Sequence, residues 1–438
     1  MMKHYLEVLS VLTVLSISCS PTENNIPEQP YVDPSEEVIP DVPVVQENDG
    51  DYRIVDGKIS YKVLRNYLSR AITEAEYLNS AKVNCDRYYG TDDDRRMLLN
   101  TGAKFIGRAM YMWNGEQKFN NSSWFETARK KIQDIHAKDP DVIFQAALFE
   151  TVSRKGIEQV QVPSWVFKAF GKEPESRNFR FDDIMDENGV NRDHWGIGTC
   201  VPDMSREEAQ MWFYYMAVRY MEIGIEALHM GQVNLMCSMG DQQAGYAGWR
   251  KMQGLIREAA KTKARRGIVL MDAHCTGIVV DGQHLFDFAS YPLRLKEVPS
   301  SSTMEATLEA GYIDNMIGKT LAGTTPSGWY ASRLPYILEF DNYGTSDHPG
   351  KSQDDWYIWG YDEISWIGMV PEEYAQRFVR ECMDYMRRTD PVGYIQMPGC
   401  RIAAAINQYG SNPYRCNTNG NGCPTGRNLE NTIKSLWR

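Results

Sequence analysis

The hydrophobic pattern of the chain alternates between helix-like and strand-like segments. Four amphipathic or charged segments have helical spacing, and each is followed by a short apolar run typical of a buried strand. These pairs are SSWFETARKKIQDIHAKDPD with VIFQAALFE, SREEAQMWFYYMAVRYMEIG with IEALHMGQV, YAGWRKMQGLIREAAKTKARR with GIVLMDAHC, and PEEYAQRFVRECMDYMRRTDPV with GYIQMPG. Three further runs are strand-like: KFIGRAMYMW, HLFDFASYPLRL and LPYILEFDNYG. This order of elements predicts a parallel sheet with helical crossovers.

The size of the body favours a (β/α)8 barrel with loop insertions over a doubly wound sheet. No G-x-G-x-x-G sequence follows any predicted strand, and the chain contains no P-loop. We predict that residues 101–438 form the barrel. Residues 51–100, with the helix-like segment YKVLRNYLSRAITEAEYLNSA, are predicted as an N-terminal helical extension packed on it. Residues 160–202 are predicted as a loop insertion, and NLENTIKSLW as a final helix.

The first 50 residues have a different composition. Residues 1–18 carry a short apolar stretch, too short to span a bilayer, and Cys19 follows the small residue Ser18. This arrangement predicts a lipoprotein-type signal peptide cleaved before Cys19, with an ordinary secretory signal as the alternative. Residues 19–50 are acidic and rich in proline, which predicts an extended tether between a lipid on Cys19 and the folded body.

Charge and cysteine content narrow the possible partners. The formal net charge of −11 argues against a nucleic-acid partner, which selects basic surfaces. The cysteines have no CxxC or zinc-finger spacing, and the only local candidate for a disulfide is Cys416 with Cys423. We therefore predict a monomer without a cofactor or metal, attached to the cell envelope as an outer-membrane lipoprotein.

Polar residues at the ends of the predicted strands are the candidates for chemistry, because the active site of a (β/α)8 barrel lies at the carboxyl ends of its strands. Strand alternation predicts that Asp272 and His274 share one inward face and that Glu339 and Asp341 share another. Glu226 and His229 are three residues apart, so alternation directs them to opposite faces of the strand (opposite parity). We prefer Glu226 as the inward residue. The full set is Glu150, Glu226, His229, Gln232, Asp272, His274, Glu339, Asp341 and Gln396.

Paired carboxylates at a barrel mouth are typical of glycoside hydrolysis, in which one acid protonates the leaving oxygen and the other attacks or activates water. We predict Glu339 and Asp272 as this pair, with Glu226, Asp341 and Glu150 as the alternative catalytic carboxylates. The predicted substrate contacts are His274, His229, Gln232 and Gln396 for sugar hydroxyls, and Trp113, Trp356 and Trp359 for sugar rings.

Two alternatives remain open. Asp272, His274, His229, Glu226 and Glu339 are residue types that bind Zn²⁺ or Mn²⁺, which would make the protein a metal-dependent barrel hydrolase. The other alternative is a glycan-binding lipoprotein that catalyses no reaction. Cys275 is a weak candidate for a nucleophile, because its parity opposes that of His274.

The sequence LSISC at the signal, the acidic tether and the barrel-like body together resemble exported lipoproteins of Bacteroides-type bacteria that carry glycoside-hydrolase-like (β/α)8 barrels. The resemblance implies an oligo- or polysaccharide substrate and a membrane partner through Cys19. It identifies no defined family. In many retaining barrel glycosidases an Asn precedes the Glu at a strand end, whereas Ile225 precedes Glu226 here.

Overall fold

A computed structural model describes residues 48–79, 91–343, 350, 358–404 and 413–437. The predicted signal peptide, Cys19 and nearly all of the tether lie outside the described residues, as does Trp356. Among the described helices, none combines the length and the apolar character needed to cross a membrane.

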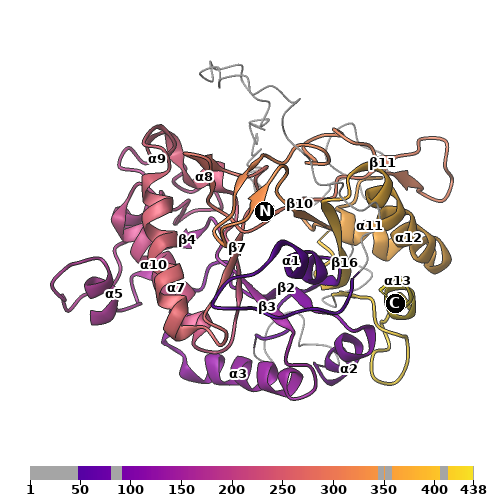
Figure 1. Cartoon of the computed structure of the whole chain (residues 1–438), viewed down its shortest axis with the longest axis horizontal. Helices are drawn as coiled ribbons and strands as arrows, with labels where there is room; N and C mark the ends of the chain where they lie inside the picture. Colours follow the sequence, from indigo (N-terminus) through magenta and orange to yellow (C-terminus); the bar gives the residue numbers. More distant parts are fainter. Residues whose placement is uncertain (1–47, 80–90, 344–349, 351–357, 405–412, 438) are drawn as a thin grey trace, which may run out of the picture. The chain divides into compact units, whose positions relative to one another are not determined.

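Eight parallel strands in the described part of the chain form a nearly closed barrel (Figure 1). In spatial order they are β1 (Ala71–Glu74), β2 (Phe105–Met110), β3 (Ile143–Ala147), β6 (Ala227–His229), β7 (Leu270–Asp272), β10 (Ala289–Pro292), β15 (Tyr336–Glu339) and β16 (Gly393–Arg401), and β16 pairs with β1. A parallel bridge between His274 and Ser290 links β7 to β10. The predicted (β/α)8 fold is thus confirmed.

Four crossover helices begin and end close to the predicted positions: α3 (Ser122–His136), α7 (Glu207–Met221), α10 (Ala247–Lys263) and α12 (Glu372–Thr389). Two further helices, α2 (Thr91–Thr101) and α11 (Glu363–Met369), were not predicted. In α3, the Asn121 side chain caps the helix by accepting from the backbone N–H groups of Ser123 and Trp124. Its buried residues recur at helical spacing, as Phe125, Ala128, Ile132 and Ile135. That apolar stripe lets the helix cover the outside of the sheet.

The strand β1 corrects the prediction for residues 51–100. The segment 61–81 was predicted as one helix, but helix α1 (Tyr61–Leu68) ends before Ser69, and Ala71–Glu74 form a barrel strand between β16 and β2. All four residues of β1 are buried. A four-residue strand buried on both faces shows no alternation, so its neighbours in the sheet determine its conformation rather than its own propensity.

Helix α1 covers the end of the barrel where the strands begin. Its buried residues Val63, Leu64, Tyr67 and Leu68 join one apolar cluster with the inward residues of the strands. The strands contribute Ala71, Phe105, Ile143, Ala227, Leu270, Ile337 and Tyr394, and Phe288 joins them from just before β10. This apolar layer fills the lower half of the barrel, so that half is packed core.

The remaining elements belong to insertions and to the C-terminus. They are η2 (Glu116–Asn120), β4 (Val152–Ser153), α4 (Arg154–Ile157), α5 (Ser164–Ala169), α6 (Phe181–Ile184), β5 (Thr199–Cys200), α8 (Val233–Met236), α9 (Ser238–Gln243), β8 (Val279–Val280), β9 (Gln283–His284), β11 (Lys296–Glu297), β12 (Ala306–Thr307), β13 (Gly323–Thr324), β14 (Tyr330–Ala331), β17 (Tyr414–Arg415) and α13 (Glu430–Leu436). The predicted insertion at 160–202 lies between β3 and α7. A second insertion, between β10 and β15, was not predicted.

The predicted disulfide between Cys416 and Cys423 is not formed. Both thiols are buried and unbonded in the structure, so this prediction was wrong. Hydrogen bonds close the loop instead, with the backbone N–H of Cys423 donating to the Gly420 carbonyl at 3.1 Å.

A bidentate ion pair between the buried Glu430 and the partly exposed Arg96 connects α13 to α2. Arg96 donates to both of its carboxylate oxygens at 2.6 and 2.8 Å, and this contact, with the Thr418 N–H and Asn100, lowers the pKa of Glu430 to about 2 against the effect of burial.

We expect Glu430→Gln to lower the free energy of unfolding at pH 7 by about 2 kcal/mol, measured by urea denaturation. Because the pKa is lowered on folding, this contribution is present above about pH 4.5 and disappears as the pH falls toward 2. The difference between the two proteins should therefore shrink on acidification. Equal urea midpoints at pH 7 would contradict the assignment, and the exposed Glu258→Gln serves as the control.

Candidate active site

The upper half of the barrel interior is polar. Each strand or its flank contributes one inward residue: Thr73, Arg108, Gln145, His229, Asp272, Ser290, Glu339 and Gln396, each at most 3 % exposed. Hydrogen bonds connect them in one network, which we call the polar layer. Burying this many polar and charged groups costs free energy compared with an apolar core. A polar layer at the carboxyl ends of barrel strands therefore indicates a functional site.

Glu339 is the centre of charge in this layer. Arg108 forms an ion pair with its carboxylate, with Arg108 Nε 3.2 Å from Oε2, and Arg401 Nη1 lies 3.3 Å from the same oxygen. Gln396 Nε2 also donates to Oε2, at 3.2 Å. Burial opposes ionisation, but the two guanidinium groups and His274 hold the pKa of Glu339 well below its ordinary value. Glu339 is therefore an ionised carboxylate at the barrel mouth.

Arg108 reaches Glu339 because β2 is irregular. Its backbone has a φ of 58°, in the left-handed region that non-glycine residues seldom adopt, and the pairing of β2 with β3 shifts register between Ile106 and Met110. The neighbouring Gly107 lies against Gln396, where a Cβ atom would come within 2.6 Å of Oε1. The bulge directs Arg108 inward and leaves room for Gln396 beside it.

Asp272 has a different environment. It accepts hydrogen bonds from Gln145 Nε2 at 2.6 Å and Ser290 Oγ at 2.7 Å, and its Oδ2 lies 2.7 Å from His229 Nδ1. Its side chain is fully buried, and burial raises its pKa to about 7. The two predicted carboxylates therefore have opposite pKa shifts, and Asp272 contacts protein groups on all sides.

The two histidines lie between the carboxylates. The ring centroids of His229 and His274 are 4.8 Å apart, and His274 Nε2 lies 3.1 Å from Arg108 Nη2 and 3.4 Å from Glu339 Oε1. The predicted inward orientation of Asp272 and His274 is confirmed. The His274 side chain is 17 % exposed, so it faces the opening while Asp272 and Glu339 lie beneath it.

Three buried polar atoms of the layer have no hydrogen-bond partner among the residues that the structure describes. They are Arg108 Nη1, His229 Nε2 and Gln396 Oε1. An unpaired buried polar atom costs about 1–3 kcal/mol. Three such atoms in one network indicate that the layer is built to contact a polar molecule.

Asp341, Glu150 and Gln232 lie around the mouth in stable pairs. Asp341 Oδ1 accepts from Arg401 Nη2 at 2.9 Å, so Arg401 bridges Asp341 and Glu339. Glu150 Oε1 accepts from Gln232 Nε2 at 2.9 Å, which joins the loops after β3 and β6. Neither acid has a direct hydrogen bond to Glu339 or Asp272 among the bonds that the structure describes.

Glu226 lies at the other end of the barrel. It precedes β6, and Arg265 and Arg266 donate to its carboxylate at 2.7 to 3.0 Å. The prediction that Glu226 rather than His229 faces the mouth was wrong, because His229 is the last residue of β6 and Glu226 lies just before its first residue.

We expect Glu226→Gln to leave any activity of the mouth unchanged and to lower the free energy of unfolding by about 2 kcal/mol, since Arg265 and Arg266 lose their counter-ion. Chemical denaturation and a turnover assay measure the two effects. Loss of turnover in a folded Glu226→Gln variant would contradict this expectation and show that Glu226 contributes to the active site.

Aromatic side chains line one side of the opening. The Trp113 ring is 42 % exposed and lies 5.4 Å from the Phe149 ring and 5.1 Å from that of Trp195. The Phe149 ring in turn has the Arg108 guanidinium over it at 5.5 Å and meets the His229 ring edge to face at 6.3 Å. Trp359 is instead held by the insertion, with Nε1 donating to the Glu305 carbonyl at 3.3 Å. Of the two predicted tryptophans that the structure describes, Trp113 is therefore the one connected to the polar layer.

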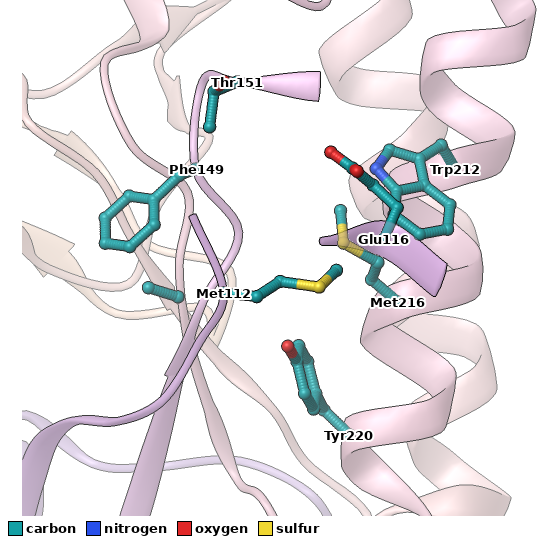
Figure 2. A pocket seen from close by; sticks show the side chains of 8 residues that line it. Met112, Glu116, Phe149, Thr151, Trp212, Met216 and Tyr220 are labelled. Carbon is teal, nitrogen blue, oxygen red and sulfur yellow. The ribbon is translucent and has the colours of Figure 1, made fainter. Parts of the chain in front are cut away.

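Two cavities lie outside the polar layer. Figure 2 shows the first, closed between the loop after β3 and helix α7 and lined by Met112, Glu116, Phe149, Thr151, Trp212, Met216 and Tyr220. Its volume of about 10 Å³ suits a single water molecule and is too small for a sugar. The second is an open groove of about 480 Å³ between residues 51–63 and 327–329, beside α1. No predicted site residue lines this groove.

Among the described residues, no group of three or more His, Cys, Asp or Glu side chains is arranged to hold a metal ion. Asp272 with His229 and Glu339 with His274 instead form two separate pairs. Cys275 is buried, and burial raises the pKa of its thiol to about 12, so it is an unreactive packing residue.

Five residues of the site were not predicted: Thr73, Arg108, Gln145, Ser290 and Arg401. Arg108 in FIGRAM and Gln145 in IFQAA are single polar residues inside apolar runs, the same signal that identified Asp272 and Glu339. That signal was available for these two residues. Thr73 lies in the strand that was predicted as helix.

No family model matches the chain, and no curated protein is significantly similar to it. The GH113 β-mannanase AaManA from Alicyclobacillus acidocaldarius is 12 % identical over 84 % of this chain and 97 % of its own, with a TM-score of 0.37. The debranching enzyme from Nostoc punctiforme is 10 % identical over 85 % and 81 %, with a TM-score of 0.41. At such values these similarities identify no function. The fold and site define a (β/α)8-barrel protein with a polar layer around an ionised glutamate.

Proposed function

We propose that this protein is a glycoside hydrolase whose active site is the polar layer and the aromatic rim above it. The observation that carries the proposal is the ionised Glu339, held by Arg108 and Arg401 at the carboxyl end of β15. An ionised carboxylate suits the nucleophile of a glycosidase, which attacks the anomeric carbon of a sugar. Trp113 offers a ring face on which a sugar can stack.

The other groups take supporting roles. His274 lies at the opening beside Glu339 and is the first polar side chain that an entering sugar meets. Gln396 shares Glu339 with the arginines and fixes the orientation of the carboxylate. The pairs of Glu150 with Gln232 and of Asp341 with Arg401 shape the rim of the site.

A second candidate function is glycan binding without catalysis. It is favoured by the burial of the two carboxylates, because the side chains of Glu339 and Asp272 are 2 % and 0 % exposed. The hydrogen-bond partners of Asp272 among the described residues, Gln145, His229 and Ser290, are buried as well. A binding protein would use His274 and Trp113 and would leave Glu339 as a structural anion.

Incubation with a panel of plant and host oligo- and polysaccharides, followed by detection of released reducing ends, separates the two candidates. The hydrolase proposal expects release from at least one glycan. Binding of a glycan, detected by calorimetry, without any release would favour the second candidate. Neither binding nor release across the panel would contradict both.

We also propose that the mature protein is a monomer attached to the outer membrane by a lipid on Cys19, with residues 19–50 as the tether. The sequence LSISC and the proline-rich acidic composition support this proposal. Mass spectrometry of the protein from membranes should find a diacylated cysteine at the N-terminus, and Cys19→Ser should release the protein into the soluble fraction. An unmodified N-terminus at another residue would overturn the anchor.

A further inference from the structure

His229 has one nitrogen engaged and one without a partner. Its Nδ1 lies 2.7 Å from Asp272 Oδ2, and its Nε2 has no hydrogen-bond partner among the described residues. The side chain is 1 % exposed and its ring centroid lies 4.8 Å from that of His274, so this nitrogen is a buried polar atom within the polar layer. Such an atom points to a polar contact that the folded chain itself does not supply.

Asp272 fixes which nitrogen carries the proton. Gln145 Nε2 and Ser290 Oγ both donate to its carboxylate, so the carboxylate acts as an acceptor toward its neighbours. His229 Nδ1 then donates as the third partner, and Nε2 keeps its lone pair. A carboxylate that holds an imidazole in one tautomer, with the second nitrogen ready to accept, is the arrangement that activates a hydroxyl group or water in many hydrolases.

We propose that His229 is the proton acceptor of this site and that Asp272 is the positioning residue that holds it. The proposal rests on the proposed hydrolase function. As Glu339 attacks the anomeric carbon, the bond to the glycosidic oxygen breaks, and that oxygen leaves with the electron pair and takes a proton from solvent water. A second water molecule then gives one proton to His229 Nε2 while its oxygen bonds to the anomeric carbon. The bond from that carbon to the Glu339 oxygen breaks, its electron pair returns to the carboxylate, and the imidazolium releases its proton to solvent.

The positions of the neighbouring groups agree with this role. His274 Nε2 lies 3.4 Å from Glu339 Oε1, and the His274 ring is 4.8 Å from that of His229, so the proposed base and the nucleophile both border His274. The Phe149 ring lies edge to face against His229, with the ring centroids 6.3 Å apart, and adds an apolar neighbour to the imidazole. Ser290 Oγ, at 3.3 Å from His229 Nδ1, is within reach to help orient the imidazole.

Nitrogen-15 NMR of the histidine rings tests the positioning without any substrate. In the parent protein, His229 should carry its proton on Nδ1. In Asp272→Asn the amide can donate to Nδ1, and the tautomer should switch to a proton on Nε2. The exposed Asp281→Asn, in the turn between β8 and β9, should leave the His229 signals unchanged. A proton on Nε2 in the parent protein would overturn the proposal.

Turnover of the glycan identified by the panel completes the test. Asp272→Asn and His229→Gln should each lose at least about 10²-fold in kcat with little change in KM, and fold as the parent does by circular dichroism. Unchanged kcat in His229→Gln, with an active parent, would overturn the role of His229 and leave the hydrolase intact. An inactive parent would instead overturn the hydrolase function, whichever tautomer the NMR spectra report.

Discussion

The Glu339→Gln variant is expected to lose about 10⁴-fold in glycan turnover, because an amide cannot attack the anomeric carbon. Gln keeps the size of Glu and can still accept a hydrogen bond from Arg108, so the shape of the site is preserved. Binding of the glycan should therefore survive within a few-fold. Initial rates of reducing-end release and calorimetric titration measure the two quantities.

Stability must be measured alongside this loss, since Glu339→Gln leaves Arg108 and Arg401 without their shared counter-ion. The variant should still be folded at 25 °C by circular dichroism, and the exposed Glu258→Gln should match the parent in rate and stability. Turnover within tenfold of the parent in a folded Glu339→Gln variant would show that Glu339 is not the nucleophile. The glycan-binding function would then become the better account of the site.

The second large effect is expected on protein stability, when the buried ion pair between Arg108 and Glu339 is broken. Arg108→Met should lower the free energy of unfolding by about 3–5 kcal/mol, because it leaves a buried carboxylate at position 339 with less charge compensation. Adding Glu339→Leu to Arg108→Met should recover part of this loss, since two apolar side chains remove both charges together. Urea denaturation of the two single variants and the double variant gives the coupling free energy between the residues.

An exposed pair supplies the comparison. Lys261 and Glu258 lie one turn apart on α10 with both side chains more than half exposed, so Lys261→Met should change stability by less than about 0.5 kcal/mol. If Arg108→Met were as mild as Lys261→Met, Glu339 would not depend on Arg108 for its charge. The pKa of Glu339 would then need another cause.

Much of the barrel could be predicted from the sequence because its helices and most of its strands have clear periodicity. Seven strands were located by their apolar runs, and β1 was missed because four buried residues next to a helix show no period of their own. The insertion between β10 and β15 consists of two-residue strands, which are too short for any pattern to indicate.

The candidate site was predicted in part, and the reasons are local. Parity placed Asp272 and His274 correctly because β7 is regular where it leaves the apolar layer. Parity could not place Arg108, because the positive φ and the register shift in β2 break the alternation on which the rule depends. Glu226 was misplaced because alternation gives the face of a strand but says nothing about which end of the strand a residue occupies.

The most direct test of the central claim, that the polar layer is the glycan site, is a crystal structure of Glu339→Gln soaked with the glycan that the panel selects. The account predicts a sugar ring over Trp113, with its anomeric carbon next to residue 339 and a hydroxyl group in contact with His274. A glycan bound only in the groove beside α1, between residues 51–63 and 327–329, would contradict it.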